Sequence, residues 1–376
     1  MNVETMDSSQ ENRRIDFAVK TISTYSPSGS ENVLADLIRD ELSEQGHQPK
    51  IDAAGNVLCE YGVGKTSLLF CGHMDTVPGE LPVKNHNGEV YGRGACDAKG
   101  ALLSLLFAFE DLANSGTKAK IIFAAVTGEE LMSVGLAELI KNNVRTDYAI
   151  FGEPGGVSRI TVGYRGHVTI RLEVVTPEVH ASAPKLTTNA AELMFDVYNS
   201  IKHGLDAVNS DSTDRVSASL TEISGGAAHN VIPGKVRATI DVRVPVGFSN
   251  AEALKKINNV VAICQTSNPD AKISVQLSDA TEPYRVKLDS PLVRAFSRSI
   301  LRTSEKPSMV TKSGTGDMNT YALAYGIDAV TYGPGDAKLS HTSDEHVSFK
   351  EIFACTAVLV NATKELVAMR NKSKSE

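Results

Sequence analysis

The stretch Leu68-Leu69-Phe70-Cys71-Gly72-His73-Met74-Asp75-Thr76-Val77-Pro78 sets how the rest of the chain is interpreted. Its apolar part is typical of a buried strand, which the proline ends. Side chains two positions apart in an extended segment point to the same side, so His73 and Asp75 can act on one object, most simply a metal ion. His-x-Asp alone is weak evidence, because a histidine at a strand end is more often structural. The rest of the chain must decide.

The composition is that of a globular protein large enough for two domains, with 376 residues, 41% hydrophobic residues and a net charge of −7. The N-terminus is polar and no apolar run has transmembrane length, so we expect a cytoplasmic protein that does not enter membranes. The negative charge argues against nucleic acid and anionic membranes as partners. Five scattered cysteines without C-x-x-C spacing predict free thiols.

Strands alternate with helices in the first 164 residues. Strands are predicted at 56–61, 67–72, 120–126 and 147–151, and helices at 99–113, 133–143 and after Ser28-x-x-Glu31. Ser28 and Glu31 have the spacing of a capping box, in which both side chains cap the start of a helix. This alternation predicts an α/β fold with a mixed, largely parallel sheet and helices on both faces, whose ligands lie at the carboxyl ends of the strands.

The pattern changes near Tyr164 and returns after Pro283. Between them the strands at 167–176, 215–223, 235–244 and 272–277 and the helices at 189–205 and 250–265 follow the order βαββαβ, which predicts a ferredoxin-like α+β domain. We therefore predict a catalytic domain from 1–164 and 282–376, with an inserted domain at 165–281. The edge strands of the insertion suit pairing with a second copy, so we expect a lid that also forms a homodimer.

Acidic and imidazole side chains recur near the predicted strand ends. Asp97 lies in a glycine-rich loop, where helix capping is the simpler interpretation. Glu129 and Glu130 follow a buried strand, and two adjacent carboxylates repel each other unless a cation lies nearby. Together these strand ends favour a metal centre. The candidate ligands are more than one zinc ion needs and suit two bridged ions: His73, Asp97, Glu130, Glu153 and His341.

The residues also carry a family resemblance over essentially the whole chain. The chain resembles the dinuclear zinc amidohydrolases that include acetylornithine deacetylase, succinyl-diaminopimelate desuccinylase and aminoacylase. The motifs are Gly72-His73-Met74-Asp75, Gly92-Arg93-Gly94-x-x-Asp97-x-Lys99-Gly100, Thr127-Gly128-Glu129-Glu130, Gly152-Glu153-Pro154 and His341-x-x-x-Glu345.

The resemblance implies a site with two divalent metal ions. Zn²⁺ is expected first, with Co²⁺ as the alternative. His73 and Glu153 would hold one ion, Glu130 and His341 the other, and Asp97 would bridge them. The resemblance further implies that Asp75 orients His73 and that Glu129 is the general base. A catalytically silent metal-binding or peptide-binding relative is the rival interpretation, and the presence of Glu129 favours an enzyme.

Within that family the chain is most similar to the hydrolases that release lysine or ornithine from an amino-group carrier protein in lysine and arginine biosynthesis. The similar stretches are 72–83, 161–166 and Ser340-His341. The substrate would then be an amide on the terminal glutamate side chain of a small acidic carrier. A small-molecule N-acyl amino acid deacylase, such as acetylornithine deacetylase or succinyl-diaminopimelate desuccinylase, is the alternative. The sequence does not separate lysine from ornithine as the released amino acid.

Six residues are predicted to bind substrate: Arg165, His180, Asn230, Arg243, Gly314 and Thr315. A lone histidine is more often a loop or core residue, but the resemblance implies that His180 reaches the active site of the other subunit and stabilises an oxyanion there. Arg165 and Arg243 suit a substrate carboxylate through bidentate pairing. Together with Lys185 they are also the candidates for attracting an acidic carrier to a protein whose net charge is negative.

Overall fold

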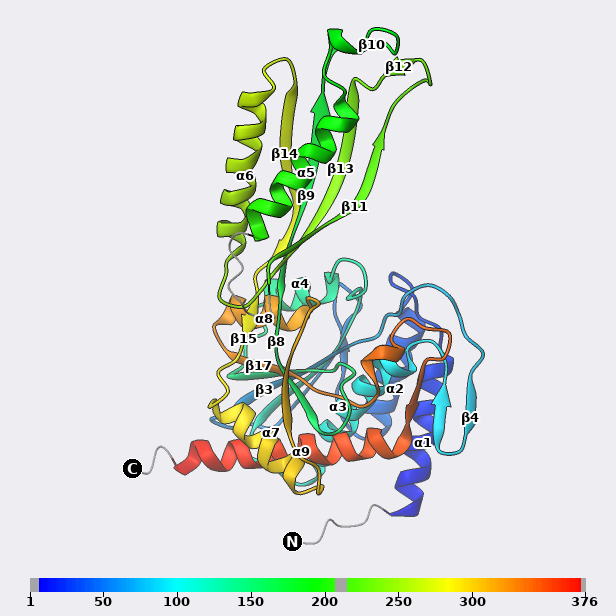
Figure 1. Cartoon of the computed structure of the whole chain (residues 1–376). Coiled ribbons are helices and arrows are strands. Elements are labelled where there is room, and N and C mark those ends of the chain that lie inside the picture. Colours follow the sequence, from blue (N-terminus) through cyan, green and yellow to red (C-terminus); the bar gives the residue numbers. More distant parts are fainter. Residues whose placement is uncertain (1–6, 207–214, 373–376) are drawn as a thin grey trace. The chain divides into compact units, whose positions relative to one another are not determined.

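The computed structural model describes residues 7–206 and 215–372, with side chains through Arg370 (Figure 1). The chain divides into two compact units. The larger unit comprises Met1–Val162, Val286–Val310 and Gly316–Glu376, and the inserted unit comprises Gly163–Arg285 with the short segment Thr311–Thr315. That segment joins the inserted unit although it lies far from it in the sequence.

The larger unit contains most of a sheet with the strand order β1-β2-β6-β3-β7-β17-β8-β15, in which β16 also pairs with β8. The strands are β1 (Lys50–Ile51), β2 (Val57–Tyr61), β3 (Ser67–His73), β6 (Lys120–Val126), β7 (Tyr148–Phe151), β8 (Arg159–Tyr164), β15 (Tyr284–Arg285), β16 (Ser308–Lys312) and β17 (Asp328–Thr331). Strands β6, β3, β7 and β17 are parallel, and antiparallel strands flank them. Covered on both faces, the parallel strands are continuously apolar.

Helices pack on both faces of this sheet (Figure 1). They are α1 (Ser8–Ser23), α2 (Asn32–Glu44), α3 (Gly100–Asn114), α4 (Val134–Lys141), α7 (Pro291–Leu301), α8 (Asp317–Tyr325) and α9 (Phe349–Lys372). Helix α9 packs against α3 and α7, and α4 packs against α8. The stretch Phe349–Arg370 of α9 is long and apolar enough to cross a membrane, but half of its most apolar window is buried inside the protein. It is a core helix. The predicted α/β fold is confirmed.

The inserted unit has a four-stranded antiparallel sheet in the order β11-β13-β9-β14. Its elements are β9 (Gly166–Val175), α5 (Ala190–Asp206), β11 (Ser217–Gly225), β13 (Lys235–Val244), α6 (Asn250–Ser267) and β14 (Lys272–Thr281), with a small sheet of β10 (Val179–His180) and β12 (Val231–Ile232). Alternate residues of β9 and β13 are buried against α5 and α6 in one core. This is the βαββαβ arrangement that the sequence predicts.

Two features were not predicted. Helix α1 is mostly polar in sequence, and its buried face includes Arg14, which is 2% exposed and lies 2.5 Å from Asp111. A small antiparallel sheet of β18 (His346–Ser348), β5 (Glu89–Tyr91) and β4 (Lys84–His86) joins two segments that are far apart in the sequence. This sheet brings the region around His341 to the glycine-rich loop that holds Asp97.

Candidate metal centre

Three of the five predicted ligands follow neighbouring parallel strands. β3 lies between β6 and β7, so their carboxyl ends bring His73, Glu130 and Glu153 to one edge of the sheet. Asp97 lies in the turn η1 (Ala95–Lys99) that leads into α3, and His341 follows the short helix η3 (Ala337–Leu339). The topology therefore brings candidate ligands from five separate segments towards this edge of the sheet.

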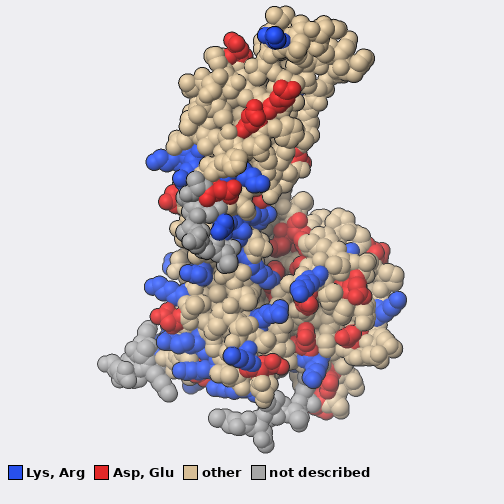
Figure 2. Space-filling model, viewed as in Figure 1, with Lys and Arg blue, Asp and Glu red and all other residues tan. Residues whose placement is uncertain are grey.

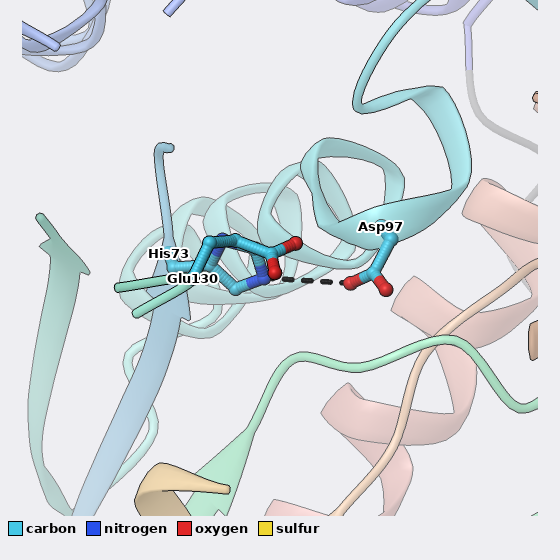
Figure 3. Close-up of side chains that lie close together, drawn as sticks. All are labelled: His73, Asp97 and Glu130. Carbon is cyan, nitrogen blue, oxygen red and sulfur yellow. Dashed lines mark ion pairs between the residues drawn. The ribbon is translucent and has the colours of Figure 1, made fainter. Parts of the chain in front are cut away.

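Three of these side chains, those of His73, Glu130 and His341, lie near Asp97. Its Oδ1 lies 3.5 Å from Nε2 of His73 and its Oδ2 lies 3.5 Å from Nε2 of His341. Nε2 of His341 is also 2.9 Å from Oε1 of Glu130. Ligand atoms of His73, Asp97 and Glu130 all lie within 4.8 Å of one another (Figure 3). A carboxylate that turns one oxygen to each of two imidazoles has the geometry of a bridge between two cations.

The state of the His73 ring fits a metal ligand. Its Nδ1 lies 2.9 Å from the main-chain oxygen of Asp75 and 3.4 Å from the Oδ1 carboxylate oxygen of the same residue. A carbonyl oxygen only accepts, so Nδ1 carries a proton, and Nε2 is the ring nitrogen that a metal ion would take. In the described part of the chain Nε2 is buried and has no hydrogen-bond partner. An imidazole ring that is held in place with Nε2 facing a carboxylate suits a cation such as Zn²⁺.

The acidic groups around this point also favour binding of a cation. Burial raises the pKa of Glu129 well above its ordinary value, and the nearby charges of Asp317, Glu153 and Glu130 raise it further, against the opposing effect of His73. Burial, followed by the charge of Asp97, raises the pKa of Glu130 as well. Carboxyl groups that hinder one another's ionisation in this way bind divalent cations readily.

Asp75 has a wider role than the predicted orientation of His73. It is fully buried, and its Oδ1 and Oδ2 each accept a hydrogen bond at 3.0 Å from the successive main-chain amides of Glu129 and Glu130. Burial opposes ionisation of Asp75, but the contact with His73 and the hydroxyl of Ser28 outweigh it and lower its pKa to about 2. Asp75 thus holds in place both His73 and the loop that carries the two glutamates.

The predicted capping box at Ser28 and Glu31 is wrong. Helix α2 begins at Asn32, and Glu31 makes no side-chain hydrogen bond that caps it. The Ser28 hydroxyl instead donates to Oδ2 of Asp75 at 2.7 Å, and Oε1 of Glu31 accepts from the amide of Gly128 at 3.1 Å. Both side chains therefore serve the metal centre rather than their own helix.

Glu345 holds the main chain at Asp97, the predicted bridging residue. Its Oε1 accepts from the amides of Asp97 at 2.9 Å and Cys96 at 3.2 Å, while its Oε2 lies 2.8 Å from Nη1 of Arg93. Glu345 is 1% exposed and Arg93 is 9% exposed. The sequence motifs contain both residues, but nothing in their spacing shows that they form a pair. Asp317, buried at the start of α8, is a further acidic group, close enough for its charge to act on Glu129, and it was not predicted from the sequence.

The predicted substrate-binding residues all lie in the inserted unit, in two groups. In one group Arg243 pairs with Asp241 at 2.7 Å, and the hydroxyl of Thr315, which follows Gly314, donates to the main-chain oxygen of Arg165 at 3.1 Å. Arg165 in turn donates to the main-chain oxygen of Arg243 at 3.0 Å.

The other group lies at the small sheet of β10 and β12. His180 ends β10 and is exposed, with Nδ1 2.7 Å from the Ser182 hydroxyl, and the main-chain oxygen of Asn230 accepts from the amide of Ala181 at 2.8 Å. The roles of both groups in substrate binding stay predictions. His167 is not among the predicted residues, yet its two ring nitrogens lie 2.7 Å from Asp279 and 3.3 Å from the Thr315 hydroxyl.

Histidines and carboxylates gathered around a bridging aspartate at the edge of a parallel sheet are typical of hydrolases that use two metal ions. Residues 69–365 match the model of Peptidase family M20/M25/M40, and the chain belongs to this family of dinuclear metallohydrolases. The expectation of an amidohydrolase-type metalloenzyme is thereby confirmed.

Archaeal relatives cover almost the whole chain. A protein of Sulfurisphaera tokodaii named LysW-lysine/LysW-ornithine hydrolase is 30% identical over 353 residues, which are 93% of this chain and 95% of that protein. A Pyrococcus furiosus protein, to which that name is provisionally assigned, is 34% identical over 354 residues, or 94% of this chain and 97% of that protein.

Solved structures share the fold. A tripeptidase of Staphylococcus aureus has a TM-score of 0.81 at 20% identity, covering 95% of this chain and 99% of that one. A Bacillus subtilis protein described as a dinuclear metal-binding peptidase of the M20 family has a TM-score of 0.76 at 14% identity, covering 97% of this chain and 99% of that one. At such identities the likeness concerns the fold and not the substrate.

Proposed function

We propose that this protein hydrolyses the amide that joins lysine or ornithine to the terminal glutamate side chain of an amino-group carrier protein, and so releases the free amino acid. The observation that carries the proposal is the similarity, at 30–34% identity over more than nine-tenths of the chain, to proteins named for that reaction. A small-molecule N-acyl amino acid deacylase is the alternative function.

We further propose that His73 and Glu153 hold one divalent ion and Glu130 and His341 the other, with Asp97 as the bridge. Zn²⁺ suits this set of nitrogen and oxygen ligands, and Co²⁺ is the alternative. When bound, the ions supply Lewis-acid catalysis of amide hydrolysis. The support for this assignment is the approach of Asp97 to both histidines and the buried, unpartnered Nε2 of His73 among the described residues.

Glu129 is the proposed general base. Its amide is fixed by Asp75, so its position in the loop is set independently of its side-chain charge. Burial raises the pKa of its carboxyl well above the ordinary value, which favours uptake of a proton. A carboxyl group of this kind can accept the proton of the attacking water and later deliver it to the leaving amine.

The proposed carrier is acidic, and the protein has a net charge of −7, so attraction must come from local positive charge. Of the three predicted residues, Arg243 pairs with Asp241 and Arg165 donates to main-chain oxygens, whereas Lys185 is exposed. Lys and Arg side chains also gather over the part of the larger unit that carries α7 (Figure 2). Salt should weaken the attraction between these positively charged surfaces and the acidic carrier.

The test compares two substrates on the metal-loaded enzyme. We expect kcat/KM for the carrier-linked lysine or ornithine to exceed that for free acetylornithine by about 100-fold or more, and to fall as salt rises from about 0.05 to 0.5 M because steering is screened. Succinyl-diaminopimelate serves as a second small substrate. Equal efficiency on carrier-linked and free substrates, without salt dependence, would leave the small-molecule deacylase as the function.

We also propose that the inserted unit forms a homodimer and that His180 acts in the active site of the other subunit. The support is that β11 and β14 are the edge strands of its four-stranded sheet, each with unpaired backbone groups that a second copy can use. Mixing His180→Ala with Glu129→Gln protein should then restore part of the activity. Subunit exchange without any recovery would show that His180 does not act across subunits.

A further inference from the structure

The segment between α1 and α2, residues 24–31, is built into the metal centre. It runs beside the end of β3, where the amide of Thr76 donates to the main-chain oxygen of Ser26 at 3.0 Å and the amide of Ser28 donates to that of Thr76 at 3.3 Å. The Ser26 hydroxyl donates to the main-chain oxygen of Met74 at 2.7 Å. We call residues 24–31 the linker segment.

The linker segment contacts three separate parts of the centre. At its start the ammonium group of the buried Lys99, two positions after Asp97, donates to the main-chain oxygen of Thr24 at 2.6 Å. In its middle the Ser28 hydroxyl donates to Asp75, and at its end Glu31 accepts from Gly128. One short segment thus joins the β3 end, the Asp97 turn and the loop with the two glutamates.

Three successive amides of that loop are held by two carboxylates. Glu31 accepts from Gly128, and the two oxygens of Asp75 accept from Glu129 and Glu130. Gly128 has φ 70°, a left-handed conformation that glycine adopts without strain, so the chain turns sharply here. Fixing the amides on both sides of this turn determines where the side chains of Glu129 and Glu130 begin.

Ser28 determines how the Asp75 carboxylate is turned. A carboxylate rotates readily about its last bond, and it can serve two amides at once only when each oxygen faces one of them. The Ser28 hydroxyl, at 2.7 Å from Oδ2, supplies a third donor that favours this one orientation. Loss of the hydroxyl leaves Asp75 in place but with one donor fewer on Oδ2, so its carboxylate is held less firmly and the effect reaches the loop indirectly.

We propose that Ser28 and Glu31 are positioning residues, which place the proposed base Glu129 and the proposed ligand Glu130 by fixing the three amides of their loop. Neither side chain touches the predicted metal ligands in this role. The inference rests on the proposed function of Glu129 and Glu130, but the positions of the amides can be measured without metal and without substrate. The positioning role of Ser28 and Glu31 can therefore be refuted independently of the proposed function.

The experiment uses the full chain with four variants. Ser28→Ala and Glu31→Ala remove the contacts, whereas Ser28→Thr keeps a hydroxyl and Glu31→Gln keeps an oxygen that can accept from Gly128. Two exposed residues outside the network provide the controls, Ser30→Ala in the same segment and Glu44→Ala at the far end of α2. Thermal melting of each variant confirms that it folds.

The first measurement is hydrogen exchange at the amides of residues 128–130 in protein stripped of metal. Ser28→Ala and Glu31→Ala should speed this exchange about tenfold relative to the controls, because each loses or loosens a hydrogen bond there. The second is kinetics of the zinc-loaded enzyme on an N-acyl amino acid. These two variants should lose about 10- to 100-fold in kcat with KM within about twofold, as expected for a misplaced catalytic group.

Ser28→Thr and Glu31→Gln should recover most of both effects. The proposal would be overturned if the alanine variants had the same exchange rates and the same kcat as the controls. Faster exchange with unchanged kcat would also overturn it, since the contacts would then be structural only. An enzyme without activity on carrier-linked substrates would contradict the proposed function and leave the exchange result unaffected.

Discussion

Removing the carboxylate of Glu345 should destabilise the larger unit strongly. Glu345→Ala deletes the acceptor of the Cys96 and Asp97 amides and leaves the guanidinium of Arg93 without its carboxylate. Both members of the ion pair are almost fully buried, at 1% and 9% exposure. Water therefore cannot replace the lost partner without a rearrangement.

The expected loss can be worked out in two ways. Charges about 4 Å apart attract by about 4 kcal/mol at an effective dielectric constant of about 20. Experience with buried ion pairs gives about 3–5 kcal/mol when one partner is removed, because the other charge stays buried. Glu345→Gln keeps an oxygen for the two amides, so its loss should be smaller. Removing Arg93 as well should cost less than the sum of the single changes, since no charge is then left behind.

The assay is urea unfolding followed by circular dichroism. The matched control is Glu365→Ala, which removes a carboxylate from Arg298 and Arg302 at the surface, where these arginine side chains are 56% and 54% exposed. That control should lose no more than about 1 kcal/mol. A loss for Glu345→Ala that is no larger than the control value would refute the reasoning, because the pair would then not behave as a buried one.

Three further predictions concern the base, the metal and acid stability. Glu129→Gln should keep metal content and KM while kcat falls by at least about 100- to 10,000-fold; near-normal turnover would refute its role. Chelation should abolish activity and added Zn²⁺ or Co²⁺ should restore it, with elemental analysis of active protein as the check. Burial raises the pKa of Asp147, but its pairing with Arg370 and hydrogen bonds from Ser67 lower it further than burial raises it. The stabilising effect of Asp147 is thus complete above the unfolded pKa of about 3.9 and is lost as the pH falls through the lower folded pKa. Urea midpoints should therefore fall more for wild type than for Asp147→Asn below about pH 4, and equal slopes would contradict this.

The parts of the fold that the sequence predicted are those whose stability is local or purely apolar. The strand that begins at residue 67 is an apolar run because β3 is covered on both faces. Its burial can therefore be predicted from the residue types alone. The candidate ligands could be found because parallel strands send their carboxyl ends to one edge. Helix α1 could not be predicted in this way, because its buried face includes the charged residue Arg14. Its burial depends on an ion pair with Asp111, which the sequence does not show.

The capping-box prediction at Ser28 and Glu31 was wrong because the same spacing of side chains can serve either a helix start or tertiary hydrogen bonds. A capping box contributes about 1 kcal/mol to a helix, whereas a hydrogen bond from a buried amide to a carboxylate contributes about 1.5–3 kcal/mol. Hydrogen bonds to Asp75 and from Gly128 are therefore favoured over capping of the helix start. The sequence does hold a sign of this outcome in Gly29, which would stand in the first turn of the helix but has φ 87°. Glycine is unfavourable inside helices and common in left-handed turns, so α2 begins only at Asn32. The side chains of Ser28 and Glu31 are then available for Asp75 and Gly128.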